Sequence, residues 1–354
     1  MQLLDRYIGR AVGGSVLAVI VVVAALLFLI TFAGEFDKIG KANYTFWNAI
    51  EFTLLKTPSL MYALFPIATL LGSIMGLGAL ANSHELIVVR SAGISIGRIV
   101  ISIMKMALVL MIFAFVLGEV IGPPAQQYAK IKRVKALSTD ISFNTEYGLW
   151  ARDGNTYIHV QRADSSGNLH QIHLYTFNKQ QQLESLLKAD TAKHNGETWV
   201  LQDVTQSSVS NERVTTKNID TMLWKTLMDP ELVQIVSVEP ETLAIWKLKS
   251  YIDYLEDNGL DTANYKLAFW GKVVMPLTIA AMVLLAVPFV MGSMRKTSIG
   301  QQILIGFLAG LSFFIANRLL GQMSLVYNFH PAVGAALPSL GVLGIAVLLM
   351  RRSN

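Results

Sequence analysis

The chain of 354 residues is 53% apolar and only 15% charged. Its mean hydropathy of +0.47 is too high for an ordinary soluble domain of this size. The absence of cysteine excludes disulfides, iron–sulfur clusters and cysteine-based zinc sites. The formal net charge of +5 is modest, and we expect no nucleic-acid partner.

Six apolar stretches follow one another along the chain, three on each side of a polar insert. Each approaches or exceeds the roughly 20 residues that a helix needs to cross the hydrocarbon core of a bilayer. Because lipid satisfies no backbone polar group, such stretches must be helical. We therefore predict an α-helical transmembrane bundle of six spans, arranged 3 + 3 around an inserted domain. The predicted spans are Val12–Ala33, Leu60–Ala81, Ile99–Leu117, Val273–Ser293, Thr297–Asn317 and Pro331–Met350.

Basic residues mark one side of this predicted bundle. The short loops on the other side hold only Lys38, Lys41 and Lys56. Since Lys and Arg accumulate in cytoplasmic loops, we predict that both termini are cytoplasmic and that the insert is extracytoplasmic. The residues on the cytoplasmic side are Arg6, Arg10, Arg90, Arg98, Arg295, Lys296, Arg351 and Arg352.

The insert has β character, because short runs of β-branched and aromatic residues alternate with turn residues. Asn195-Gly196 between two such runs indicates a hairpin with a type I′ turn. Several short strands with little helical periodicity predict an all-β sandwich or jelly roll. The predicted strands are Thr156–Val160, Gln171–Phe177, Thr198–Val204 and Leu232–Val238.

Two helical stalks are predicted to join this β-domain to the bundle, at Gln126–Lys135 and Glu241–Asp257. Gly259 ends the second stalk, and Asp261 or Thr262 caps the helix that follows. The chain is predicted to divide into three parts. Residues 1–122 hold the first three spans and a cytoplasmic helix at about 82–93. Residues 123–266 form the extracytoplasmic β-domain with its stalks, and residues 267–354 hold the last three spans.

Several motif matches look catalytic, but their context argues against catalysis. Gly93–Gly97 fits the G-x-S-x-G pattern around Ser95, yet it precedes a membrane helix instead of joining a strand to a helix. The chain has neither a P-loop nor a complete H-E-x-x-H zinc motif. We therefore predict no enzyme, no metal site and no cofactor. Gly72 and Gly76 form G-x-x-x-G inside a span and predict close helix packing.

The cytoplasmic loop Asn82–Gly93 is the first candidate functional site. Asn82 and Glu85 have the spacing of a capping box, and Gly93 is a natural helix end, so we predict a helix of about ten residues. It carries Leu86 on an apolar face and exposes His84, Glu85 and Arg90. From the residues alone, docking to a cytoplasmic partner and lying on lipid headgroups are equally supported.

Cations near the outer membrane face form the second candidate site. Lys38 and Lys41 follow the first span, Lys130 and Arg133 follow the third, and Arg318 lies at the outer end of the fifth. Converging cations suit a phosphorylated lipid headgroup, because Arg binds phosphate through two parallel hydrogen bonds. For any single residue other than Arg318, anchoring by a snorkelling side chain is the favoured alternative.

Three segments carry a resemblance to a known family: Leu4–Gly9, His84–Gly93 and Gly148–Asn155. The number of spans, the position of the insert and the chain length agree with the same family, so the resemblance covers the whole chain. The chain resembles the lipopolysaccharide-export permease family, LptF/LptG, and is most like its LptG branch.

The resemblance implies a non-enzymatic permease subunit of an ABC transporter in the bacterial inner membrane, with a jelly-roll β-domain in the periplasm. The implied partners are a homologous LptF subunit, a dimer of the ATPase LptB, and LptC. Together they extract lipopolysaccharide and pass it to a periplasmic bridge through LptC and LptA. ATP is used by the partner ATPase, so no cofactor is implied for this chain.

The resemblance also assigns roles to residues. The family's coupling helix lies between spans two and three, and Glu85 takes its acidic position there, which favours docking to the ATPase over the lipid-bound alternative. Lys41, Lys130 and Arg133 fall where family members carry basic residues that contact lipid phosphates and inner sugars.

This chain departs from the family at the outer end of its first span. Relatives can carry a lysine there, three residues before Asp37, but this chain has Gly34 with Glu35 beside it. Lys38 or Arg318 is expected to compensate. The rival interpretation is a membrane-anchored periplasmic scaffold or receptor that transports nothing, and a weaker one is an intramembrane hydrolase using Ser95.

Overall fold

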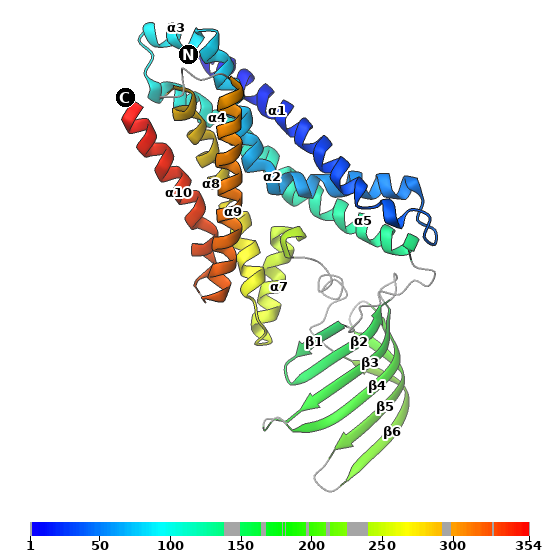
Figure 1. Cartoon of the computed structure of the whole chain (residues 1–354). Coiled ribbons are helices and arrows are strands. Elements are labelled where there is room, and N and C mark those ends of the chain that lie inside the picture. The colour runs from blue at the N-terminus through cyan, green and yellow to red at the C-terminus, as the bar shows by residue number, and fades with distance from the viewer. Residues whose placement is uncertain are drawn as a thin grey trace.

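The structure is a computed structural model of the whole chain, in which an α-helical bundle carries a β-sheet beyond one of its ends (Figure 1). Both chain termini lie with helix α3 (Glu85–Ser91) at the opposite end of the bundle. We call these the α3 end and the sheet end. The described residues are 2–137, 149–163, 168–178, 180, 182–195, 198–209, 213–224, 240–291, 299–327 and 329–353.

In the part of the chain that the structure describes, six helices are long and apolar enough to cross a membrane, which confirms the predicted 3 + 3 bundle. The third span continues through a π-helical turn into a polar extension, so one long helical rod leads from the bundle toward the sheet. The spans are α1 (Gln2–Ala33), α2 (Phe46–Asn82), α4 (Ile96–Phe115) with η2 (Val116–Ile121) and α5 (Gly122–Leu137), α8 (Ala263–Met291), α9 (Ile299–Val326) and α10 (Pro331–Ser353).

Glycines allow α1 and α2 to pack backbone to backbone. A Cβ atom on Gly72 would lie 2.3 Å from the Cα atom of Val16, and one on Gly76 would lie 2.8 Å from that of Val12. The G-x-x-x-G motif therefore has the predicted packing role. Helix α8 packs against α2, α4 and α10, and α2 and α8 are the most buried of the described spans.

The inserted all-β domain is confirmed as a six-stranded antiparallel sheet in sequence order. Its buried face carries Ile158, Leu174, Ala189 and Leu201, while the residues between them point the other way. The predicted strand Leu232–Val238 lies outside the described residues, so a second jelly-roll layer stays a prediction. The strands are β1 (Leu149–Asp153), β2 (Thr156–Ala163), β3 (Leu169–Phe177), β4 (Leu183–His194), β5 (Trp199–Val209) and β6 (Val214–Trp224).

The predicted hairpin at Asn195 joins β4 to β5. His194 and Trp199 form the last strand pair, and beyond it the backbone N–H of Asn195 donates a hydrogen bond to the carbonyl oxygen of Thr198 at 3.0 Å. The side chain of Asn195 accepts a hydrogen bond from the backbone N–H of Thr198, at 2.9 Å, a local bond typical of turns. Gly196 lies outside the described residues, so the type I′ turn stays a prediction.

Both predicted stalks are helical. The first is α5, and the second is α7 (Ile245–Asp257), which a short 3₁₀ turn, η3 (Pro240–Thr242), precedes. Gly259 has φ +63 and ends α7, and Asp261 accepts a hydrogen bond from the N–H of Ala263 at the start of α8. The second stalk therefore leads directly into the fourth span.

Candidate coupling and headgroup sites

Helix α3 is the predicted coupling helix, and it is shorter than the sequence indicated. It has seven residues and begins at Glu85, because α2 continues through Asn82 and the chain turns at Ser83 and His84. His84 has φ +62 and caps nothing with its side chain, so the predicted Asn82–Glu85 capping box is wrong. Gly93 has φ +85 and ends the helical segment as predicted.

The side chains of α3 separate into a buried and an exposed group. Leu86 is buried in the core of the bundle, whereas His84 and Arg90 are exposed. Glu85 accepts hydrogen bonds from the hydroxyl groups of Tyr7 in α1 and of Ser83, and these bonds hold the pKa of Glu85 below its ordinary value. The carboxylate thus ties α3 to the first turns of α1.

A cavity of about 310 Å³ lies between α3 and the adjacent end of α8. Leu86, Ile87 and Arg90 line it from α3, and Val290 and Met291 line it from α8. A hollow that combines apolar side chains with a cation can accept a side chain of a docking protein.

Ser95 caps a helix. Its hydroxyl oxygen accepts a hydrogen bond from the N–H of Arg98 at 3.3 Å, at the N-terminus of α4. The G-x-S-x-G match is therefore a turn between two helices and lacks the strand that a nucleophile elbow requires.

The charge inside the third predicted span has a partner that the sequence analysis missed. Asp5 of α1 accepts hydrogen bonds from Arg98 at 3.0 Å and from Lys105 at 2.6 Å, and it also bonds the hydroxyl of Ser102. A lone Lys within an apolar stretch is itself a signal to look for an acidic partner. The partner here, Asp5, lies in the first turn of α1, and its hydrogen bonds join α1 to α4 at the α3 end.

Glu35 organises the predicted headgroup cations at the sheet end. It lies between α1 and η1 (Phe36–Lys38) and is only 5% exposed. Its carboxylate accepts hydrogen bonds from Lys38 at 2.9 Å, from Tyr44 at 3.0 Å and from Arg133 of α5 at 3.0 Å. Two of the five predicted cations are thus brought together around one carboxylate.

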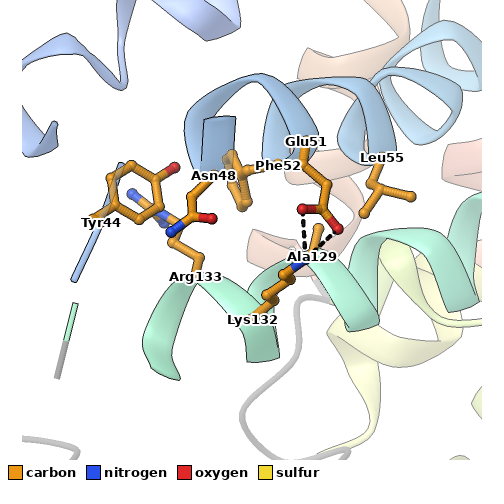
Figure 2. Close-up of a pocket in the computed structure, with 8 residues that line it drawn as sticks. All are labelled: Tyr44, Asn48, Glu51, Phe52, Leu55, Ala129, Lys132 and Arg133. Atoms are coloured by element: carbon orange, nitrogen blue, oxygen red, sulfur yellow. Dashed lines mark hydrogen bonds and ion pairs between the residues drawn. The ribbon is translucent and has the colours of Figure 1, made fainter. Parts of the chain in front are cut away.

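Neighbouring groups fix these side chains in place. The guanidinium of Arg133 also lies 4.7 Å from the ring centre of Phe52. Burial and the hydrogen bond to Glu35 raise the pKa of Tyr44 to about 12, so its hydroxyl stays a donor. Beside them, Lys132 is bonded to Glu51 of α2 at 2.6 Å (Figure 2).

The other three predicted cations lie apart from Glu35. Lys41 is exposed in the turn after η1, and Arg318 is exposed on α9; among the described residues neither side chain has an ion pair. Lys130 is half-buried on α5 and lines a cavity of about 200 Å³ beside α7. The structure therefore distributes the predicted headgroup residues over the loop after α1, over α5 and over α9.

Glu119 and Lys272 form a buried ion pair that the sequence analysis did not find. Their charged atoms are 2.8 Å apart, and their side chains are 2% and 6% exposed. The residues are 153 positions apart, so only the fold brings them together. Each is a single charge beside an apolar stretch, and their opposite signs were the only sequence signal that they could form a pair.

Comparison with known proteins agrees with this architecture. The family model of the lipopolysaccharide export system permease LptF/LptG matches residues 6–352. The chain belongs to the LptF/LptG family. It is 36% identical to the lipopolysaccharide export system permease protein LptG of Haemophilus influenzae, over 95% of each chain. It is 33% identical to the LptG protein of Escherichia coli K12, over 99% of this chain and 98% of that one.

The family membership confirms the resemblance drawn from the three sequence segments. An LptF/LptG permease with six apolar helices is a multi-pass membrane protein, and its β-domain is inserted between the third and fourth spans. The roles of individual residues in α3 and around Glu35 stay predictions.

Proposed function

We propose that this permease of the lipopolysaccharide export system extracts lipopolysaccharide from the bacterial inner membrane and passes it toward a periplasmic bridge of LptC and LptA. Its partners in this proposal are a homologous LptF subunit, an LptB ATPase dimer and LptC. The chain itself hydrolyses no ATP and uses no cofactor. Membership of the LptF/LptG family over residues 6–352 is the observation that carries this proposal.

The orientation follows from the two ends of the bundle. Both termini and α3 lie at one end, and the sheet lies at the other (Figure 1). Because the α3 end carries the basic loop residues, it faces the cytoplasm and the β-domain faces the periplasm.

Two spans offer large apolar faces to a partner subunit. Only 11% of the apolar part of α1 and 17% of that of α9 are buried within this chain, against 67% for α2 and 56% for α8. In the proposal, α1 and α9, the first and fifth spans, form lateral gates with the LptF subunit. Lipid enters the central space between the two subunits through these gates.

Helix α3 receives force from the ATPase. Its surface carries the polar groups of His84, Glu85 and Arg90, and its Leu86 side chain packs in the bundle core. The Tyr7–Glu85 hydrogen bond provides a direct contact from α3 to α1. When α3 moves, this contact opens or re-forms, and one of the two gate helices is released or held accordingly.

The cations at the sheet end bind the phosphorylated headgroup. Lys41 and Arg318 are exposed and give the first contacts, while Lys38, Lys130 and Arg133 contribute once the headgroup lies beside α5. Glu35 compensates the charge of Lys38 and Arg133 while no phosphate is bound.

The decisive experiment measures ATP-driven release of lipopolysaccharide from vesicles that contain this chain, its partner subunit, the ATPase and LptC. Glu85→Ala should abolish release while the complex still assembles. The matched control is Glu184→Ala, which removes an exposed carboxylate of β4 and should release like wild type. Equal release by the two variants would contradict coupling through α3 and would favour the scaffold interpretation.

A further inference from the structure

The Glu119–Lys272 ion pair lies where three segments of the chain meet. Glu119 belongs to η2 of the third span, Lys272 to α8 of the fourth span, and α7 begins beside both. One carboxylate oxygen of Glu119 contacts the Lys272 ammonium, and the other accepts the N–H of Ile245 at 2.6 Å. Nothing in the proposed transport cycle accounts for this arrangement.

The residues next to Glu119 determine where its carboxylate lies. A Cβ atom on Gly118 would lie 2.2 Å from the ring of Tyr62, so only glycine lets the π-helical turn approach α2 this closely. The same ring lies 5.2 Å from the Lys272 ammonium. The π turn, where an i→i+5 pattern replaces the α-helical one, directs Glu119 toward α8 and α7.

Glu119 replaces the missing cap of α7. The N-cap position of α7 is Ala244, whose side chain cannot accept a hydrogen bond. A carboxylate at a helix N-terminus satisfies an unpaired N–H and interacts favourably with the helix dipole. This cap comes from the third span, so the same bond that completes α7 also holds it to the bundle.

Side-chain packing does not fill the space between the third span and α7. The cavity of about 200 Å³ separates η2 and α5 from η3 and α7, with Lys130 on one side and Trp246 on the other. A buried ion pair adds little net stability compared with apolar side chains of the same size. Its presence here therefore indicates a role in fixing how the segments are placed.

We propose that Glu119 is a positioning residue of transport: it makes α7 move together with the third and fourth spans, so that a movement of the spans reaches the β-domain. The inference rests on the proposed export function. Because α7 leads directly into the fourth span, the bond from Glu119 to the Ile245 N–H is the contact that joins the third span to these two segments, and Lys272 balances the buried charge.

The test compares two double variants in the reconstituted complex. E119Q/K272M removes both charges and keeps an oxygen that accepts the Ile245 N–H. E119L/K272M removes both charges and that acceptor. Neither variant leaves a lone buried charge, so both should assemble. The control is K249M/D253N, which removes an exposed ion pair from α7 itself.

Two quantities are measured: lipopolysaccharide released per ATP hydrolysed, and hydrogen exchange of the amides in the first turn of α7. E119Q/K272M and the control should match wild type in both. In E119L/K272M, ATP hydrolysis should persist, release per ATP should fall several-fold, and exchange should be on the order of fivefold faster, as for the loss of one N-cap. If the leucine variant does not assemble, E119M/K272M takes its place with the same expectations.

A third variant separates positioning from local helix stability. Adding Ala244→Ser to E119L/K272M gives α7 a cap of its own that does not reach the third span. We expect slow exchange to return while release stays low; recovery of both would overturn the proposal. Wild-type release per ATP in E119L/K272M would also overturn it, and so would low release in E119Q/K272M with α7 still protected. If the wild-type complex releases nothing, the export function itself is wrong.

Discussion

At the sheet end of the bundle, the carboxylates of Glu35 and Glu119 are almost completely buried, and each contacts more than one segment of the chain. At the α3 end, Asp5 and Glu85 also join separate segments, but both side chains are in contact with solvent. The bonds are of similar length at the two ends, and the surroundings differ.

This difference has a physical consequence. Breaking a buried pair leaves an uncompensated charge in a medium of low dielectric constant, which is costly. Near the surface, water replaces a lost partner, so the same bond can open and close cheaply. The sheet end is therefore fixed by its charges, while the α3 end can rearrange when a partner docks.

The largest effect is expected at Lys272. Lys272→Met leaves the Glu119 carboxylate buried without its counter-charge and should destabilise the purified protein by about 3–5 kcal/mol. The free energy of unfolding in detergent measures this. E119Q/K272M should recover most of the loss, and a single variant as stable as the double one would show that the pair is not isolated from water.

Glu35→Gln should have a smaller effect on stability and an opposite effect on binding. The neutral side chain no longer compensates Lys38 and Arg133, which should cost about 1–3 kcal/mol. The two freed cations should then crosslink more strongly to lipopolysaccharide. The control is Glu51→Gln, which removes the partner of Lys132, a carboxylate that is more exposed than Glu35. Weaker crosslinking in Glu35→Gln would contradict a headgroup site at Arg133.

A pH dependence on the acid side is expected at the α3 end. The pKa of Glu85 is lowered in the folded protein, so its hydrogen bonds stabilise α3 above the ordinary pKa of 4.5, and this contribution is lost as pH falls through the folded pKa. Tyr7→Phe should therefore lower the melting temperature slightly at pH 7 and by less once Glu85 is protonated. A difference of the same size in acid would exclude the charge of this carboxylate as the cause.

The smallest effect is expected for Lys249→Ala on the exposed face of α7. Lys249 and Asp253 form an ion pair at 2.5 Å, but both side chains are more than half exposed. Water and salt screen such a pair, so melting temperature and release should both equal wild type. A marked loss would mean that surface charge on α7 contributes to its placement, and the distinction between buried and exposed pairs would fail.

Hydropathy and local turn signals predicted much of this fold. The six spans, the inserted β-domain, both stalks and the helix ends at Gly93 and Gly259 follow from short-range patterns. The capping box at Asn82 was wrong because α2, an apolar helix packed in the bundle, continues past a local stop signal. Tertiary packing overrode the propensity of a few residues.

The candidate site was less predictable, because its contacts are long-range. The sequence identified Lys38 and Arg133 as cations at one membrane level but could not show that Glu35 holds both. In the sequence, Glu119 and Lys272 each resemble the charged residue that ends an apolar span. Their pairing requires the π-helical turn and the close approach of Gly118 to Tyr62, and neither has a signature in sequence spacing.

The most direct test of the fixed and mobile ends uses spin labels in the complete complex, since the chain has no cysteine of its own. Labels at Arg6→Cys and Arg90→Cys report the distance from α1 to α3, and labels at Lys135→Cys and Lys249→Cys report the distance from α5 to α7. Between the nucleotide-free and ATP-trapped states, we expect the first distance to change and the second to stay constant. A constant distance at the α3 end with a changing one at the sheet end would contradict the account.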